Sequence, residues 1–136
     1  MNVMSDSANY APVKLVVERV DKATGEIKSE FLEKHGAAFP QDEGRRLSIV
    51  LYFIPVGSNT YFVNTSKVEI NVPAGSKVFP IRASRSYMVA DETEPRTSWS
   101  TVGWATVTKK GLMLRFDAVP ASLNAVIFFH KKEEDS

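Results

Sequence analysis

Two segments of this chain, residues 36–59 and 103–124, present the same order of residue types. Each begins with Gly-x-Ala and continues through a polar turn that contains Gly and two adjacent basic residues. Each then alternates apolar and other residues up to a Pro and reaches an Asn four residues later. Aligning Pro55 with Pro120 gives an offset of 65 residues, which brings the apolar positions of both segments into register. We therefore interpret the chain as an internal duplication.

The apolar run of each segment has a period of two, which is typical of a strand with one buried face. Pro lacks an amide donor, so each Pro is expected at a strand end or edge. The runs after each Pro, TYFV and AVIFF, are again rich in strand-forming residues, and the same offset matches Tyr61 with Val126. We expect the alternating positions to form the core: Leu47, Ile49, Leu51 and Phe53 in the first copy, and Leu112, Leu114 and Phe116 in the second.

Each copy extends upstream to a further strand. VKLVVERV at 13–20 is followed by a DKATG turn, and its expected counterpart is SYMVA at 86–90, followed by polar residues. The fold class predicted is all-β: two homologous four-stranded antiparallel units packed as one compact, pseudo-symmetric domain. The expected boundaries are an N-terminal tail at 1–12, units at 13–64 and 86–131, a connecting β-hairpin at 65–85, and a polar tail at 132–136.

The segment EIKSEFLEKHG at 26–36 is ambiguous between helix and strand. Its apolar residues have helical spacing, and Gly36 resembles a helix C-cap. Its partner in the second copy, TSWSTVGWATV, is rich in β-branched and aromatic residues and predicts a strand. Because equivalent segments of a duplication adopt the same structure, we favour a strand over 29–39.

Composition sets the broad class. The chain has 136 residues, 43% hydrophobic residues and a net charge of +1, which are typical of a globular domain with one core. The absence of Cys excludes disulfides and thiolate metal sites. The first residues resemble no signal peptide, and the longest apolar run, at 49–56, is too short to span a bilayer. We expect a cytoplasmic protein that does not enter a membrane.

The order of motifs resembles that of a group of small, poorly characterised bacterial and mobile-element β-proteins. Their pattern reads W-x3-G-x-A, then G-[KR]-G-[FL], then L-D-A-[LV]-P. The second copy carries it at Trp99, Gly103, Ala105, Lys110, Gly111, Leu112, Leu114, Phe116, Asp117, Ala118 and Pro120; the first copy has Phe31 in place of the Trp. The resemblance implies the β-unit and an origin in a phage or plasmid, and it implies no activity.

Catalytic motifs are lacking. The two histidines, His35 and His130, have no carboxylate or histidine at ligand spacing, and no phosphate-binding loop or nucleophile elbow occurs. Most carboxylates lie in charge-mixed turns, which are typical of solvated positions and not of an acid–base pair. We predict no enzyme, no metal and no cofactor.

The predicted hairpins contain basic residues, and aromatic residues lie near them in the sequence. Arg45-Arg46 and Lys109-Lys110 occupy equivalent turns. Single-stranded nucleic acid needs aromatic faces for its bases and Lys or Arg for its phosphates. We therefore expect sequence-tolerant binding of single-stranded DNA or RNA, with stacking by Tyr52, Tyr87, Trp99 and Trp104 and phosphate contacts by Arg45, Arg46, Arg82, Arg85, Lys109 and Lys110.

The alternative is a protein–protein interaction module. Two similar units resemble a homodimer of single-copy proteins, and their outer aromatic residues would then dock on a host or replication protein or on a second copy of the chain. The two hypotheses differ in salt dependence, because nucleic-acid binding weakens steeply with salt and an aromatic protein interface does not.

Overall fold

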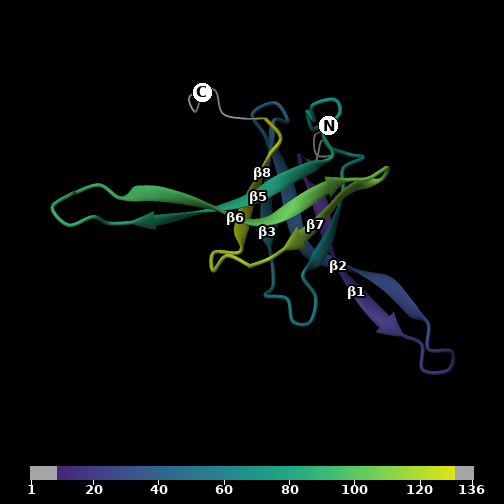
Figure 1. Cartoon of the computed structure of the whole chain (residues 1–136). Coiled ribbons are helices and arrows are strands. Elements are labelled where there is room, and N and C mark those ends of the chain that lie inside the picture. Colours follow the sequence, from purple (N-terminus) through teal and green to yellow (C-terminus); the bar gives the residue numbers. More distant parts are fainter. Residues whose placement is uncertain (1–8, 131–136) are drawn as a thin grey trace, which may run out of the picture.

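The computed structural model describes residues 9–130, and strands dominate them (Figure 1). These residues contain eight strands and no helix. The strands are β1 (Ala11–Val20), β2 (Ile27–Gln41), β3 (Arg46–Leu51), β4 (Thr60–Asn64), β5 (Val78–Tyr87), β6 (Arg96–Val107), β7 (Gly111–Phe116) and β8 (Asn124–Phe128). The all-β class predicted from the sequence is confirmed.

Hydrogen bonds close the strands into an antiparallel barrel in the order β1-β2-β3-β8-β5-β6-β7-β4. The ring divides into two runs of four strands that are connected in the same order. The first key is β3-β2-β1-β4 and the second key is β7-β6-β5-β8. Each is a Greek key, in which three consecutive hairpin-connected strands are joined by a fourth that returns beside the first. The pairs β4–β7 and β3–β8 join the two keys. The result is one compact domain whose two halves have the same strand pairing.

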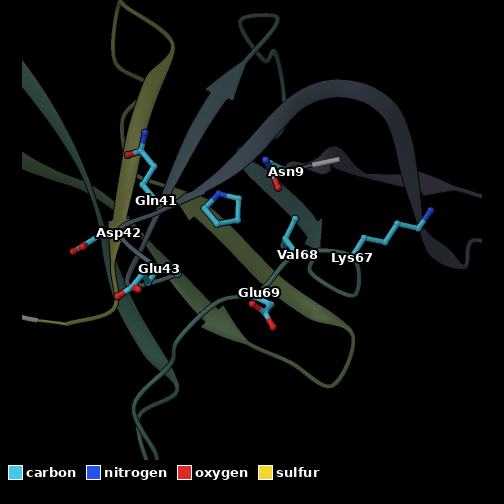
Figure 2. A pocket seen from close by; sticks show the side chains of 9 residues that line it. Asn9, Gln41, Asp42, Glu43, Lys67, Val68 and Glu69 are labelled. Carbon is cyan, nitrogen blue, oxygen red and sulfur yellow. The ribbon is translucent and has the colours of Figure 1, made fainter. Parts of the chain in front are cut away.

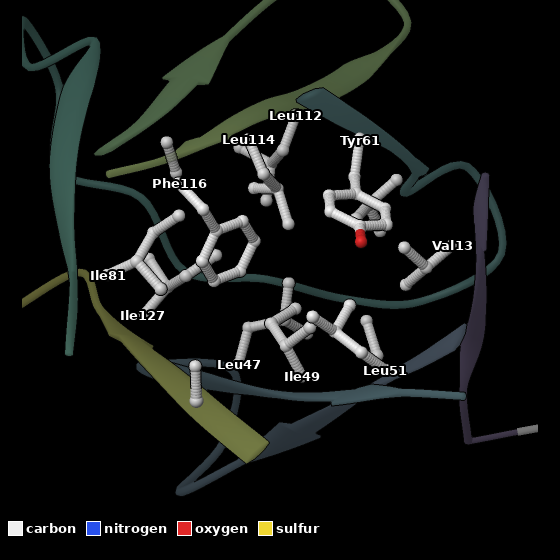
Figure 3. Packing of buried hydrophobic residues seen from close by; sticks show 14 of the residues in the cluster. Val13, Leu47, Ile49, Leu51, Tyr61, Ile81, Leu112, Leu114, Phe116 and Ile127 are labelled. Carbon is white, nitrogen blue, oxygen red and sulfur yellow. The ribbon is translucent and has the colours of Figure 1, made fainter. Parts of the chain in front are cut away.

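The barrel interior is filled with apolar side chains (Figure 3). Tyr61 and Phe116 pack edge to face there, with ring centroids 5.6 Å apart. Six of the seven core residues expected from the alternation are buried: Leu47, Ile49, Leu51, Leu112, Leu114 and Phe116. An eight-stranded barrel is just wide enough for side chains to fill it. Functional residues must therefore lie on the outer surface or at the ends of the barrel.

Phe53, the seventh expected core residue, is exposed, and that prediction is wrong. Strand β3 ends at Leu51, and the amide of Tyr52 then donates to the carbonyl of His35 at 3.0 Å. Because β2 and β1 separate β3 from β4, the chain must leave β3 and cross the end of the barrel. Phe53 lies in this crossing, outside the alternating pattern.

The counterpart of the first strand was expected at 86–90. In the structure this counterpart is β5, which begins further upstream and spans Val78–Tyr87. Residues 65–77, expected as part of a connecting hairpin, are not a strand. They cross one end of the barrel, where Val68, Ile70 and Val72 pack against the core and the amide of Asn71 donates to the carbonyl of Gly44 at 2.7 Å. A closed barrel has no free edge that an additional hairpin could join. The alternating apolar residues of this segment therefore cover the end of the barrel.

The last strands of the two halves match at an offset of 64 residues, and not at the expected 65. Leu47 pairs with Ile127 and its equivalent Leu112 pairs with Val63. Tyr61 therefore corresponds to Ala125, not to Val126. The connection before β8 is one residue shorter, and a shift of one residue moves every side chain to the other face of a strand.

Two long hairpins extend from the barrel, β1–β2 in purple and blue and β5–β6 in teal and green (Figure 1). Residues 26–36, which were ambiguous in the sequence, belong almost entirely to β2, and β1 pairs with β2 as far as Val20 and Ile27. The strand preference for this segment is confirmed. The expected tails lie largely outside the described residues, although Ala11 and Pro12 already belong to β1.

Candidate nucleic-acid interface

A bulge in β6 places both tryptophans on the outer surface of the barrel. Ile81 pairs with Gly103, but the next residue of β5, Arg82, pairs with Thr101. Val102 is therefore the additional residue, and its side chain is buried. A bulge of this kind changes which face the following residues occupy. Trp99 on one side of the bulge and Trp104 on the other consequently share the outer face.

Two arginines flank β8 on this outer face. Arg46 on β3 pairs with Phe128, and Arg82 on β5 pairs with Val126. The indole of Trp99 reaches the ring of Phe128, with centroids 5.4 Å apart and planes at 80°. The Nε atoms of both arginines are buried and have no hydrogen-bond partner. Neighbouring atoms therefore cover the Nε atom of each arginine beside β8.

The outer face continues across β6 and β7. Trp104 pairs with Pro80 on one side and with Arg115 on the other, and 48% of its surface is exposed. The turn with Lys109 and Lys110 ends the same hairpin. We call this surface the arginine face and define it by Arg46, Arg82, Trp99, Trp104, Arg115 and Phe128.

Charge is distributed unevenly around the barrel. Strands β3, β5, β6, β7 and β8 contain no Asp or Glu, and their basic residues are Arg46, Arg82, Arg85, Arg96 and Arg115. On β1 and β2, by contrast, Lys14 pairs with Glu33 at 3.2 Å and Arg19 pairs with Glu30 at 2.7 Å. Within residues 9–130, no carboxylate forms an ion pair with an arginine of the arginine face. The face therefore presents uncompensated positive charge beside exposed aromatic surface.

Arg85 and Tyr87 lie on the β5–β6 hairpin but on its other face. They alternate with Arg82 along β5, and the guanidinium of Arg85 lies 5.6 Å from the centroid of the Tyr87 ring. Near the tip of the hairpin, Arg96 pairs with Glu92. The hydrogen bonds that the Arg96 guanidinium donates to Glu92, and secondly its side-chain hydrogen bond with Tyr87, raise the pKa of Arg96. The structure thus separates Arg85 and Tyr87 from the arginine face.

Arg45 lies in the turn between β2 and β3, beside acidic residues. Asp42, Glu43 and Gly44 all have positive φ, and the amide of Arg45 donates to the carbonyl of Asp42 at 3.0 Å. This turn borders a pocket of about 580 Å³, whose lining includes Glu69. Figure 2 shows the side chains that line it. Three carboxylates against the single ammonium of Lys67 make this pocket unfavourable for an anionic ligand.

Tyr52 is separated from the arginine face as well. It begins the β3–β4 crossing, next to His35 on β2, and 49% of its surface is exposed. Of the ten residues predicted from the sequence, Arg46, Arg82, Trp99 and Trp104 come together on one surface, with Lys109 and Lys110 at its end. Arg45, Tyr52, Arg85 and Tyr87 lie elsewhere.

The histidines have local structural contacts. The ring of His35 packs edge-on against Phe53, with centroids 5.5 Å apart, and Nε2 of His130 lies 2.9 Å from the carbonyl oxygen of Asn71. Within residues 9–130, no three His, Asp or Glu side chains gather as metal ligands would. The same residues include no helix long and apolar enough to cross a membrane.

Sequence reasoning missed Arg115 and Phe128. Arg115 was visible as the one charged residue in the alternating run LMLRF, on the face opposite the core. Phe128 lies in the run AVIFF, to which the sequence assigned no functional role, and its place on the outer surface follows from its pairing with Arg46. Comparison of the chain with family models, with curated proteins and with solved structures finds no match.

Proposed function

We propose that the arginine face binds single-stranded nucleic acid, without sequence preference and without catalysis. The observation that supports this proposal is the composition of β3, β5, β6, β7 and β8. The charged residues of these strands are all arginines, and exposed aromatic rings lie among them. Arginine forms charge-assisted bonds with phosphate oxygens, and aromatic rings stack on any base. A surface of this kind favours a strand with unpaired bases.

The division of labour follows from the strand pairing. Trp104 is the most exposed tryptophan and is the candidate platform for a base, while its neighbour Arg115 is in position for the adjoining phosphate. Arg46 and Arg82 would hold phosphates further along, on both sides of β8. Stacking on a protein aromatic contributes about 1–3 kcal/mol per base. We therefore expect Trp104→Ala to weaken binding roughly 5- to 150-fold.

The test is fluorescence anisotropy of labelled oligo-dT at several salt concentrations. Neutralising three phosphates of a single strand predicts a slope of about −2 for log K against log salt concentration. Removing one arginine, for example in Arg115→Ala, should make the slope shallower by about 0.7. The matched control is Arg19→Ala, because Arg19 is already paired with Glu30.

A wild-type protein that does not bind oligo-dT at micromolar concentration and low salt refutes the proposal. So does binding that Trp104→Ala and Arg115→Ala leave unchanged. Both variants must retain the melting temperature of the wild type, because a large loss of stability would mean that the side chains support the fold.

A second candidate function is protein docking through the β3–β4 crossing. Its side chains are apolar and unusually exposed: 59% for Phe53, 73% for Ile54 and 91% for Val56. Residues 47–60 contain no Asp, Glu, Lys, Arg or His. Exposed apolar patches on soluble domains commonly mark protein interfaces.

The partner that can be tested directly is a second copy of the chain. Sedimentation velocity should then detect self-association that persists at high salt and that the double variant Ile54→Ser, Val56→Ser abolishes. If the protein stays monomeric at high concentration, a second copy of the chain is excluded as the partner.

A further inference from the structure

The two Greek keys correspond on both sides of their bulges, although the bulge in β2 contains one residue more than the bulge in β6. Val13 pairs with Gly36 where Ile81 pairs with Gly103. Beyond the bulge, Leu15 pairs with Leu32, and the equivalent pair is Ala83 with Ser100. Counting from this second pair of partners gives three correspondences: Lys14 with Arg82, Phe31 with Trp99, and Glu33 with Thr101.

The first key therefore carries a counterpart of the arginine face. The rings of Phe31 and Phe62 are stacked, with centroids 5.6 Å apart and planes at 20°. Nζ of Lys14 lies 6.0 Å from the centre of the Phe31 ring. We call this surface the first-key face and define it by Lys14, Phe31, Glu33 and Phe62. Like the arginine face, it has two aromatic rings in contact and a cation, but Phe62 occupies the position of Val126 and not that of Phe128.

Charge and shape nevertheless distinguish the two faces. On the first-key face, Lys14 is paired with Glu33 at 3.2 Å, whereas Arg82 pairs across the strands with the neutral Thr101. The other members of the arginine face also have no counterpart of their kind. Matching the strand pairs places Ala37 at the position of Trp104, Val50 at that of Arg115 and Gly111 at that of Arg46.

We propose that each chain binds one nucleic-acid strand, on the arginine face alone, and that the first-key face does not bind nucleic acid. This inference rests on the proposed function and specifies its stoichiometry and its determinants. The carboxylate of Glu33 neutralises Lys14 and repels a phosphate at close range. The absence of a second tryptophan and of two further arginines removes the remaining contacts.

The experiment uses pairs of variants at equivalent positions. Stoichiometric titration of the full chain with oligo-dT long enough for one face should end at one strand per chain. Arg82→Ala should weaken binding about tenfold or more, since bonds to a charged donor are lost, while Lys14→Ala should change affinity less than about twofold. Likewise, Trp99→Ala should weaken binding much more than Phe31→Ala.

Charge insertion tests the role of the neutral residue opposite Arg82. Thr101→Glu imitates Glu33 and should weaken binding about tenfold or more. Its control is Ser98→Glu, which adds the same charge on the other face of the hairpin, opposite Arg85. Ser98→Glu should lower affinity much less than Thr101→Glu at the same salt concentration.

The outcomes separate this inference from the proposed function. Two strands per chain, or equal losses for Lys14→Ala and Arg82→Ala, overturn the single-face inference and leave nucleic-acid binding intact. Equal effects of Thr101→Glu and Ser98→Glu overturn the role of position 101. A wild-type chain that binds no oligonucleotide overturns both the function and the inference.

Discussion

Trp99 and Phe128 form an edge-to-face contact across β5, with ring centroids 5.4 Å apart. The two residues belong to β6 and β8, which are both neighbours of β5 but not of each other. The indole therefore extends over the strand that carries Arg82. This contact links the outer surfaces of three strands into one continuous face.

Removing the Phe128 ring should release Trp99. In a Trp104→Phe background, Trp99 is the only tryptophan left, because the chain contains two. We expect Phe128→Ala to shift its fluorescence emission to longer wavelength, since the indole becomes more hydrated, and to weaken oligo-dT binding. Edge-to-face pairs contribute about 0.5–1.5 kcal/mol beyond their buried area, so the effect on stability should be moderate. An unchanged emission maximum would mean that the Phe128 ring does not shield the indole from water.

The end of β3 predicts opposite results for two apolar residues that are close in sequence. Leu51 is 3% exposed, whereas Phe53 is 59% exposed. Leu51→Ala should destabilise the fold by about 2–5 kcal/mol, as for other buried leucines. Phe53→Ala should change stability by less than about 0.5 kcal/mol, as expected for a surface position. Urea denaturation of both variants provides the measurement. Similar losses of stability would contradict the position of Phe53 in a crossing outside the core.

Most strands and most core residues could be predicted from the sequence, because period-two alternation is a local property of the chain. Leu47 and Leu112 are both buried and occupy equivalent places in the two keys. The position of Phe53 was not predictable in this way. Alternation alone does not tell where a strand stops, which here is decided by the need to pass β2 and β1 before pairing again.

The candidate site was predictable only in part, for a related reason. Residue type identified Arg46, Arg82, Trp99 and Trp104 as candidates, but their common face depends on the bulge at Val102 and on pairing between distant strands. Tyr87 is also an aromatic residue and lies on β5, the strand of Arg82, but its side chain is on the other face of that strand.

Close backbone approach explains the Gly of the repeated Gly-x-Ala motif. A Cβ on Gly103 would overlap the carbonyl oxygen of Arg115, which belongs to the neighbouring strand and cannot move without disturbing the ladder. We expect Gly103→Ala to destabilise the fold by about 1–3 kcal/mol or more, like other overpacked sites. The control is Gly57→Ala, because a Cβ there meets open space and the cost is limited to about 1 kcal/mol for its positive φ. Thermal unfolding compares the two, and equal losses would contradict the steric explanation.

Tyr61 carries a hydroxyl group inside the barrel, and its ionisation can be followed by titration. Its side chain is fully buried and its hydroxyl, which points into the interior, has no hydrogen-bond partner (Figure 3). Burial raises the pKa of this hydroxyl from 10.0 to about 12, because the phenolate would lose its hydration. Tyr61→Phe removes an unsatisfied buried group and should leave stability at pH 7 unchanged or higher.

The pH dependence of Tyr61→Phe then has a defined sign. Below pH 10 the hydroxyl is neutral in both the folded and the unfolded chain, so wild type and variant respond alike. Above pH 10 the unfolded wild type releases a proton that the folded form retains, and its stability falls relative to the variant. The difference should reach about 1 kcal/mol at pH 11 and approach about 3 kcal/mol above pH 12. Urea midpoints of both proteins from pH 7 to pH 11 measure it, and parallel curves over that range would mean that the hydroxyl ionises as readily inside the barrel as in water.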